Sequence, residues 1–127
     1  PKIIDLYYQY YLYLLKKDRG IKAEEILNKL NEKQIEFKAK IYSPFVELEL
    51  IKIDKENKNF EEAINTLEQF LKNTRRIKEE DLAHVYYELS KLYSQNENET
   101  KYDEVVSKCK AIQTSSENFY KKMCDEL

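Results

Sequence analysis

The sequence predicts an all-α fold of antiparallel helical hairpins stacked on one another, and a recurrence along the chain is the first observation behind this prediction. Residues 60–64 read aromatic, acid, acid, apolar, apolar, and residues 102–106 repeat that order. A fainter copy around Ala23 places Ala23, Ala63 and Val105 40 and 42 positions apart. A recurrence near 40 residues in a helical chain indicates stacked hairpins, which usually present binding surfaces and seldom carry chemistry.

Composition is the second observation, because the 127 residues include one glycine and two prolines. So few helix breakers argue against a sheet protein and favour long helices. Hydrophobic residues make up 42% and charged residues 36%, which suits one domain with a buried core. We expect residues 1–127 to form a single domain, the C-terminal part of a longer chain. The net charge of −2, with acids and bases interleaved, argues against nucleic acid as a partner.

Helical periodicity divides the chain into about seven helical stretches. They run from 3 to 17, from 21 onward, from 34 to 57, from 60 to 73, from 78 to 95, from 100 to 113, and from 115 or 116 to the end. Gly20 is expected to cap the first helix at its C-terminus. Ser43-Pro44 either starts a helix within the third stretch or kinks a continuous one. Thr114-Ser115-Ser116 is expected to supply the N-cap of the last helix.

The same periodicity predicts which side chains face inward. The predicted inward residues of the second and third stretches are Ala23, Ile26, Leu27, Leu30, Phe37, Ile41, Phe45, Leu48 and Ile51. Those of the fourth and fifth are Phe60, Ala63, Ile64, Leu67, Phe70, Leu71, Leu82, Val85, Tyr86, Leu89, Leu92 and Tyr93. Those of the last two are Tyr102, Val105, Val106, Cys109, Ile112, Phe119, Tyr120, Met123 and Leu127. Short polar links between the stretches make neighbouring helices antiparallel.

These hairpins resemble a tetratricopeptide (TPR) repeat. Phe60 and Ala63 match the aromatic and the small residue that open a second helix in that family, and Leu89, Ser90 and Tyr93 match its first-helix set. The likeness covers residues 44–113 best. The chain departs from the family at Asp54, where an aromatic is expected, in having no Trp and no closing Pro, and in a period longer than about 34 residues. Residues 117–124 are similar to the ends of bacterial periplasmic TPR proteins, some of which serve flagellar motors.

The resemblance implies a TPR-like right-handed superhelix that binds a partner helix or peptide in a groove lined by the first helices. It therefore implies a non-catalytic scaffold for protein–protein interaction and complex assembly, in a bacterial envelope or flagellar motor among the settings it suggests. The alternative is a peptide-sensing regulatory domain coupled to a missing effector domain. The compartment stays open between the cytoplasm and a bacterial periplasm.

Residues of the kinds used in catalysis are scarce, so we expect no enzyme, no cofactor and no metal site. His84 is the one histidine, and the sequence places no second ligand at metal spacing beside it. Paired acids at 24–25, 61–62 and 79–80 fall in first turns of helices, where carboxylates stabilise the helix dipole. A single glycine rules out a glycine-rich phosphate loop.

Cys109 and Cys124, 15 positions apart, lie on the last two predicted helices. Reflection about the joint near Thr114 places Cys109 opposite Tyr120, one helical turn from Cys124, within reach of a disulfide. Two reduced core cysteines are slightly favoured over a bridge. A bridge implies an oxidising compartment such as a periplasm.

The first predicted helix is unusually apolar, because eleven of the thirteen residues from 3 to 15 are apolar or aromatic. It is interrupted by Asp5 and Gln9 and is too short to span a bilayer, so no direct membrane insertion is expected. Four explanations account for so many tyrosines on one helix. They are contact with a preceding helix that has been removed, contact with a protein partner, self-association, and simple packing on the next two helices. The residues expected to contact a partner are Tyr7, Tyr11, Tyr86, Tyr87 and Tyr93.

Overall fold

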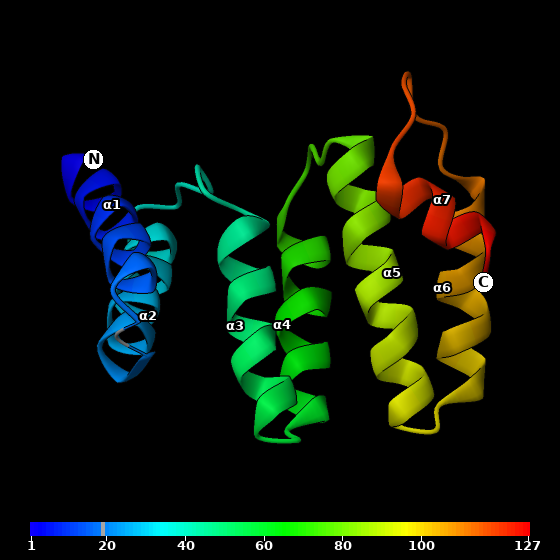
Figure 1. The fold of residues 1–127 in the computed structure, drawn as a ribbon. Coiled ribbons are helices and arrows are strands. Elements are labelled where there is room, and N and C mark those ends of the chain that lie inside the picture. The colour runs from blue at the N-terminus through cyan, green and yellow to red at the C-terminus, as the bar shows by residue number, and fades with distance from the viewer. Residues whose placement is uncertain (19) are drawn as a thin grey trace. The chain divides into compact units, whose positions relative to one another are not determined.

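The computed structural model describes residues 1–18 and 20–127, which form helices and no strand (Figure 1). The helices are α1 (Lys2–Lys16), α2 (Gly20–Glu36), α3 (Phe45–Glu56), α4 (Phe60–Asn73), α5 (Glu79–Gln95), α6 (Glu99–Ala111) and α7 (Phe119–Asp125). The predicted all-α class is confirmed. The chain divides into two compact units, Pro1–Lys52 and Ile53–Leu127, with the boundary inside α3.

The first unit consists of α1, α2 and the beginning of α3. Its buried apolar side chains are Ile4, Tyr11, Leu14, Ala23, Ile26, Leu27, Leu30, Val46, Leu48 and Ile51. Aromatic rings join α1 to the start of α3: the Tyr8 ring stacks on Tyr42 with centroids 3.9 Å apart and meets the edge of Phe45 at 5.5 Å. The tyrosines that make α1 so apolar therefore pack partly inside its own unit.

The predicted helical stretch from 34 to 57 is wrong in its first third. Helix α2 continues to Glu36, and an irregular segment precedes α3. Phe37 and Ile41, predicted to face inward, are 46% and 57% exposed. The chain leaves α2 through Lys38, whose φ of 51° is left-handed, while the Ala39 N–H donates to the Gln34 carbonyl. This 6→1 bond is the usual way to end a helix.

A buried polar network holds this irregular segment to both neighbouring helices. The Gln34 side chain accepts a hydrogen bond from the Tyr42 N–H at 2.8 Å and donates one to the Ser43 hydroxyl at 3.2 Å. Ser43 in turn donates to Glu47 at 3.0 Å, and Gln34 and Glu47 are both buried. Helix α3 begins directly after the cis Ser43–Pro44 bond, so Pro44 starts a helix and does not kink one.

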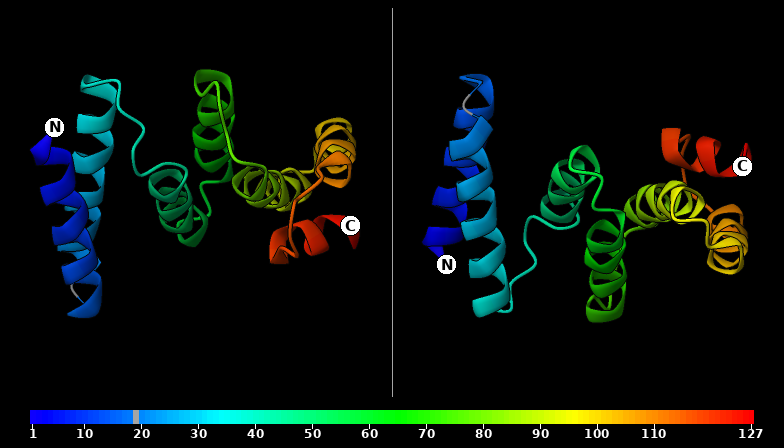
Figure 2. Two further views of the ribbon diagram at one scale, coloured as in Figure 1. Left: turned by 90° about the horizontal axis from the view of Figure 1, so that it is seen from above. Right: turned by 90° about the horizontal axis from the view of Figure 1, so that it is seen from below.

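The second unit is arranged around α5. Helix α6 packs along α5, and α4 and α7 lie on opposite sides of α5 (Figure 2). The buried apolar side chains of α4, α5 and α6 are Ala63, Ile64, Leu67, Phe70, Ala83, Val85, Leu89, Leu92, Tyr93, Val105 and Cys109. All but Ala83 are among the predicted inward residues, because a period of 3.6 residues identifies the buried stripe of a helix.

Asparagines cap three of these helices at their N-termini. The side chains of Asn59, Asn98 and Asn118 accept hydrogen bonds from the backbone N–H three residues on, at 3.4, 3.1 and 3.0 Å. Helix α7 is therefore capped by Asn118, and the prediction that Thr114-Ser115-Ser116 begins it is wrong. Gly20 is likewise the first residue of α2 and not the cap of α1; the left-handed residue after α1 is Asp18, and Arg19 lies outside the described residues.

The turns that join α3 to α4 and α5 to α6 are the same structure. In each, the middle residue of an Asn-X-Asn sequence, Lys58 or Glu97, is left-handed with a φ of 57° or 55°. The following asparagine donates its N–H to the carbonyl five residues back, that of Asp54 or Tyr93, and then caps the next helix. The repeat visible in the sequence thus includes the turns, at a spacing of 39 positions between the capping asparagines.

Candidate interaction site

A groove runs along α5 in the second unit, between α4 and α6, and we call it the α5 groove. It encloses about 190 Å³ and is lined by Glu68, Leu71, Tyr86, Leu89, Tyr93, Lys101, Glu104, Val105 and Lys108. Leu89 and Val105 are buried and form an apolar floor, while Lys101, Glu104 and Lys108 of α6 are exposed along one rim. The volume is below the roughly 300–1,000 Å³ of small-molecule sites, so the groove suits individual side chains of a partner.

One end of the α5 groove is organised by the carboxylate of Glu68. The Tyr93 hydroxyl and the Lys101 ammonium both donate to Glu68 Oε2, each at 2.8 Å. Burial raises the pKa of Glu68, but the hydrogen bonds from Lys101 and Tyr93 and the positive charge of Lys101 together lower the pKa below its ordinary value. Glu68 is therefore ionised at neutral pH and ties α4 to both α5 and α6.

The neighbouring tyrosines of α5 separate onto two sides of the helix. Tyr86 lies half-buried in the wall of the α5 groove, and Tyr93, 6% exposed, lies at its end. Tyr87 lies half-buried against α7 instead, with its ring 6.1 Å from that of Tyr120 and 4.9 Å from the Lys91 ammonium. The three predicted contact residues of α5 therefore do not share one surface.

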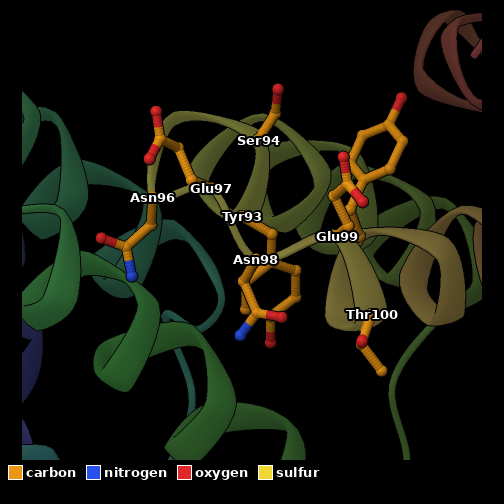
Figure 3. Close-up of a pocket in the computed structure, with 8 residues that line it drawn as sticks. Tyr93, Ser94, Asn96, Glu97, Asn98, Glu99 and Thr100 are labelled. Carbon is orange, nitrogen blue, oxygen red and sulfur yellow. The ribbon is translucent and has the colours of Figure 1, made fainter.

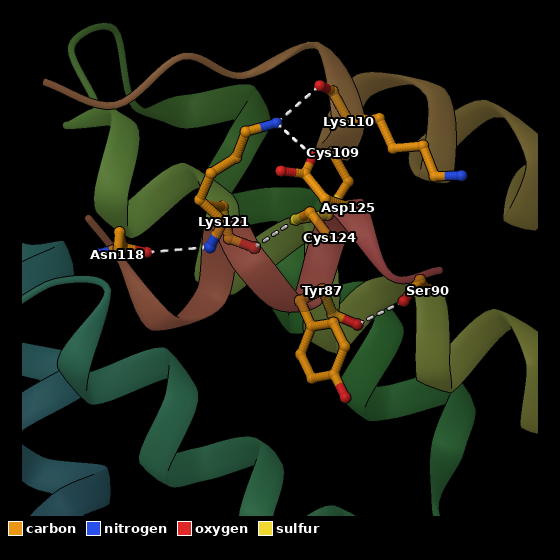
Figure 4. The surroundings of a disulfide bond; sticks show 9 residues. Tyr87, Ser90, Cys109, Lys110, Asn118, Lys121, Cys124 and Asp125 are labelled. Carbon is orange, nitrogen blue, oxygen red and sulfur yellow. Dashed lines mark hydrogen bonds and ion pairs between the residues drawn. A yellow bond between two sulfur atoms is a disulfide. The ribbon is translucent and has the colours of Figure 1, made fainter. Parts of the chain in front are cut away.

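On the α7 side of α5, a disulfide joins Cys109 of α6 to Cys124 of α7 (Figure 4). The bridge, which was the less favoured alternative from the sequence, is made by two fully buried sulfurs packed on Ala83 and Ile112. The Lys121 ammonium adds a second tie, because it donates to the Lys110 carbonyl at 2.7 Å and to Asp125 at 2.6 Å. Helix α7 is thus fixed to α6 despite its seven residues.

His84 belongs to the same side of α5. Its ring stacks on Tyr120 of α7 with centroids 3.6 Å apart, and its Nε2 lies 4.0 Å from Glu88. Glu88 also pairs with Lys55 at 3.2 Å and with Lys91 at 3.5 Å. The His84 ring therefore packs between α5 and α7.

In the first unit, Tyr7 and Tyr11 lie on α1. Tyr7 is half-buried, whereas Tyr11 is 4% exposed and donates its hydroxyl to Glu49 at 2.9 Å. The partner-contact role of the five tyrosines stays a prediction. Tyr7, Tyr86 and Tyr87 are partly exposed, whereas Tyr11 and Tyr93 are buried and hydrogen-bonded.

A second hollow, of about 960 Å³, surrounds the turn between α5 and α6 and is broad and open to solvent. Figure 3 shows that its polar side chains, among them Ser94, Glu97 and Thr100, point in different directions and do not converge on one centre. In the part of the chain that the structure describes, no three His, Cys, Asp or Glu residues gather as a metal site. Within the same residues, no helix combines the length and apolar character needed to cross a bilayer.

Comparisons of the chain with protein-family models, with curated proteins and with solved structures found no match.

Sequence reasoning missed the polar residues that organise both units. Gln34 and Glu47 received no role from the sequence, and Glu68 of α4 and Lys101 of α6 are 33 positions apart. The one usable signal is that Gln34 and Glu68 fall next to the apolar stripes of their helices, where a polar residue has to find a partner.

Proposed function

We propose that this chain is a non-catalytic protein-interaction scaffold, built of TPR-like stacked hairpins in a right-handed superhelix, that binds a partner helix or peptide and supports assembly of a larger complex. The observation that carries the proposal is the α5 groove, which is concave, has an apolar floor and carries charges of both signs on its rim. Such a combination favours a polypeptide over a small cofactor.

The chemistry of the α5 groove favours a partner segment with an apolar side chain next to a polar one. Leu89 and Val105 would receive the apolar side chain, and the half-buried ring of Tyr86 would pack beside it. Glu104 and Lys108, one turn apart on α6, would pair with charges of the partner. The hydrogen bonds of Glu68 would hold α4, α5 and α6 in place before the partner binds. Binding would then cost little entropy for ordering the groove.

The buried disulfide supports an oxidising compartment such as a bacterial periplasm, because such bridges persist where thiols are not kept reduced. A complex of the bacterial envelope, with the flagellar motor as one example, is the assembly that the TPR resemblance suggests.

The test uses the two adjacent tyrosines as a matched pair. Peptides are selected on the wild-type protein from a displayed library, and the affinity of the best one is measured by calorimetry for wild type, Tyr86→Ala and Tyr87→Ala. Because Tyr86 lies in the groove and Tyr87 against α7, Tyr86→Ala is expected to weaken binding about tenfold and Tyr87→Ala to leave it unchanged. Equal affinities for all three proteins, or a selection that enriches no peptide, would contradict the proposal.

A further inference from the structure

The outer face of α1 carries four large apolar side chains in one line, which we call the outer stripe. They are Ile3, Leu6, Tyr10 and Tyr13, exposed by 36%, 68%, 41% and 55%. Their spacing of three, four and three residues is the spacing at which one helix meets another in coiled-coil packing. The outer stripe is thus shaped to receive a helix.

The outer stripe contributes less than its neighbouring face to the packing of α1 on its own unit, since its side chains are 36–68% exposed. That packing uses the neighbouring face, where Ile4, Tyr11 and Leu14 are buried. A single exposed apolar residue is ordinary, but a contiguous apolar line on a helix marks an interaction site. Tyr10 and Tyr13 suit such a site because a tyrosine buries its ring while its hydroxyl stays in water.

Positive charge lies at both ends of the outer stripe. Lys2 is exposed at the start of α1 and Lys16 in its last turn, and the Lys17 ammonium lies 5.8 Å from the centre of the Tyr13 ring. The acid of α1, Asp5, accepts a hydrogen bond from the Tyr42 hydroxyl of its own unit, so its carboxylate lies on the Tyr42 side of α1. A partner therefore meets an apolar line bordered by ammonium groups.

This charge pattern decides between two occupants. A second copy docked antiparallel would set Lys2 against the other copy's Lys16, and a parallel copy would set each lysine against its counterpart. Like charges face each other in both arrangements, which disfavours self-association through α1. A helix with acids at the ends of its apolar line meets opposite charge instead.

We infer that the outer stripe binds an amphipathic helix of another protein, in which acidic residues flank the apolar line. The inference adds a second surface to the proposed scaffold. It rests on the scaffold proposal only in assigning a binding role, since it concerns α1 and not the α5 groove.

Two synthetic peptides serve as probes, both cross-linked to hold a helix and both with leucines at the same three- and four-residue spacing. One has glutamates beside the leucines and the other has lysines. Binding to the intact protein is followed by fluorescence anisotropy at low and physiological salt. The glutamate peptide is expected to bind about fivefold more tightly than the lysine peptide, with a difference that shrinks as salt rises.

Matched variants locate the binding site. Leu6→Ala is expected to weaken the glutamate peptide about tenfold, and Leu15→Ala, which is also exposed on α1 but outside the outer stripe, is expected to leave it unchanged. The double variant Lys2→Glu, Lys16→Glu should reverse the preference between the two peptides. Both leucines are exposed, so the variants should keep the wild-type melting curve.

Three results would overturn the inference: equal binding of the two peptides, binding that Leu6→Ala does not affect, and a dimer seen by ultracentrifugation that Leu6→Ala dissociates. The last result would assign the stripe to a second copy. Tyr86→Ala should leave binding of the glutamate peptide unchanged. The proposal for the α5 groove and the inference for the outer stripe can therefore be refuted independently.

Discussion

The Tyr11 hydroxyl donates a hydrogen bond to Glu49 at 2.9 Å and so joins α1 to α3 across 38 positions of the chain. Tyr93 makes the equivalent bond in the second unit, donating to Glu68 of α4 at 2.8 Å. In each unit, a buried tyrosine thus donates a hydrogen bond from its hydroxyl to a neighbouring carboxylate. Each bond joins two helices of its unit, and hydrogen bonds to carboxylates are among the stronger ones in proteins.

Replacement of Tyr11 by Phe is expected to lower the free energy of unfolding by about 1–2 kcal/mol, because the ring stays buried while Glu49 loses a donor. Urea titration followed by circular dichroism measures the change. Tyr10→Phe is the control, since Tyr10 lies on the same helix and is 41% exposed. Equal stability of the two variants would show that the bond to Glu49 contributes little.

Alkaline pH is expected to destabilise the protein more than an ordinary helical domain. Burial, aided by the hydrogen bonds to Glu49 and Glu68, raises the pKa of Tyr11 and of Tyr93 well above the ordinary value near 10. The folded state therefore keeps both hydroxyls protonated while the unfolded chain ionises. The stabilisation is complete below pH 10 and is lost progressively as the pH rises above it.

Melting temperatures recorded between pH 8 and about pH 11.5 test this expectation. The decline should be shallower in the double variant Tyr11→Phe, Tyr93→Phe, which lacks the two titrating groups. Parallel curves for the variant and the wild type would place the alkaline sensitivity elsewhere.

Glycine at the two equivalent turns is expected to stabilise the protein. Lys58 and Glu97 are exposed and left-handed, a conformation that costs an L-residue with a Cβ roughly 1–2 kcal/mol and costs glycine little. After the greater flexibility of glycine in the unfolded chain is deducted, each of Lys58→Gly and Glu97→Gly should add about 0.5–1 kcal/mol. Ser107→Gly, at an exposed position inside α6, should instead destabilise, and thermal unfolding compares the three variants.

Loss of the disulfide is expected to lower the free energy of unfolding by about 3 kcal/mol, the loop-entropy value for cysteines 15 positions apart. The double variant Cys109→Ala, Cys124→Ala is compared with wild type with and without reductant. Reductant should destabilise the wild type and leave the variant unchanged.

Hydrogen exchange in α7 should rise first when the bridge is removed, because the bridge is the main covalent tie of that helix to α6. Two titratable thiols in the native protein would contradict the bridge.

The local pattern of the sequence was sufficient for several helices. The predicted range 60–73 coincides with α4, because Asn59 caps its start and its apolar side chains follow a regular helical period. The range from 34 to 57 failed because periodicity cannot tell one long helix from two that share an apolar pattern. The break depends on the bonds that Gln34 makes with Tyr42 and Ser43.

The candidate site was predicted less completely. Tyr86 and Tyr93, both on the predicted apolar stripe, line the α5 groove, but Tyr87, their neighbour, faces α7. What Tyr87 packs against depends on how α7 folds back onto α5, and the bridge between Cys109 and Cys124 helps to fix that position. No local sequence pattern contains this information.

By itself, the sequence determined the all-helical class, most helix bounds in the second unit and most of its buried stripe, because these follow from side-chain period and capping residues close in the chain. Only the tertiary structure decided the pairing of Cys109 with Cys124, the Glu68 bonds that join three helices, and which apolar face of α1 remains exposed. Those features depend on groups 15 or more positions apart, and their positions are set by the packing of whole helices.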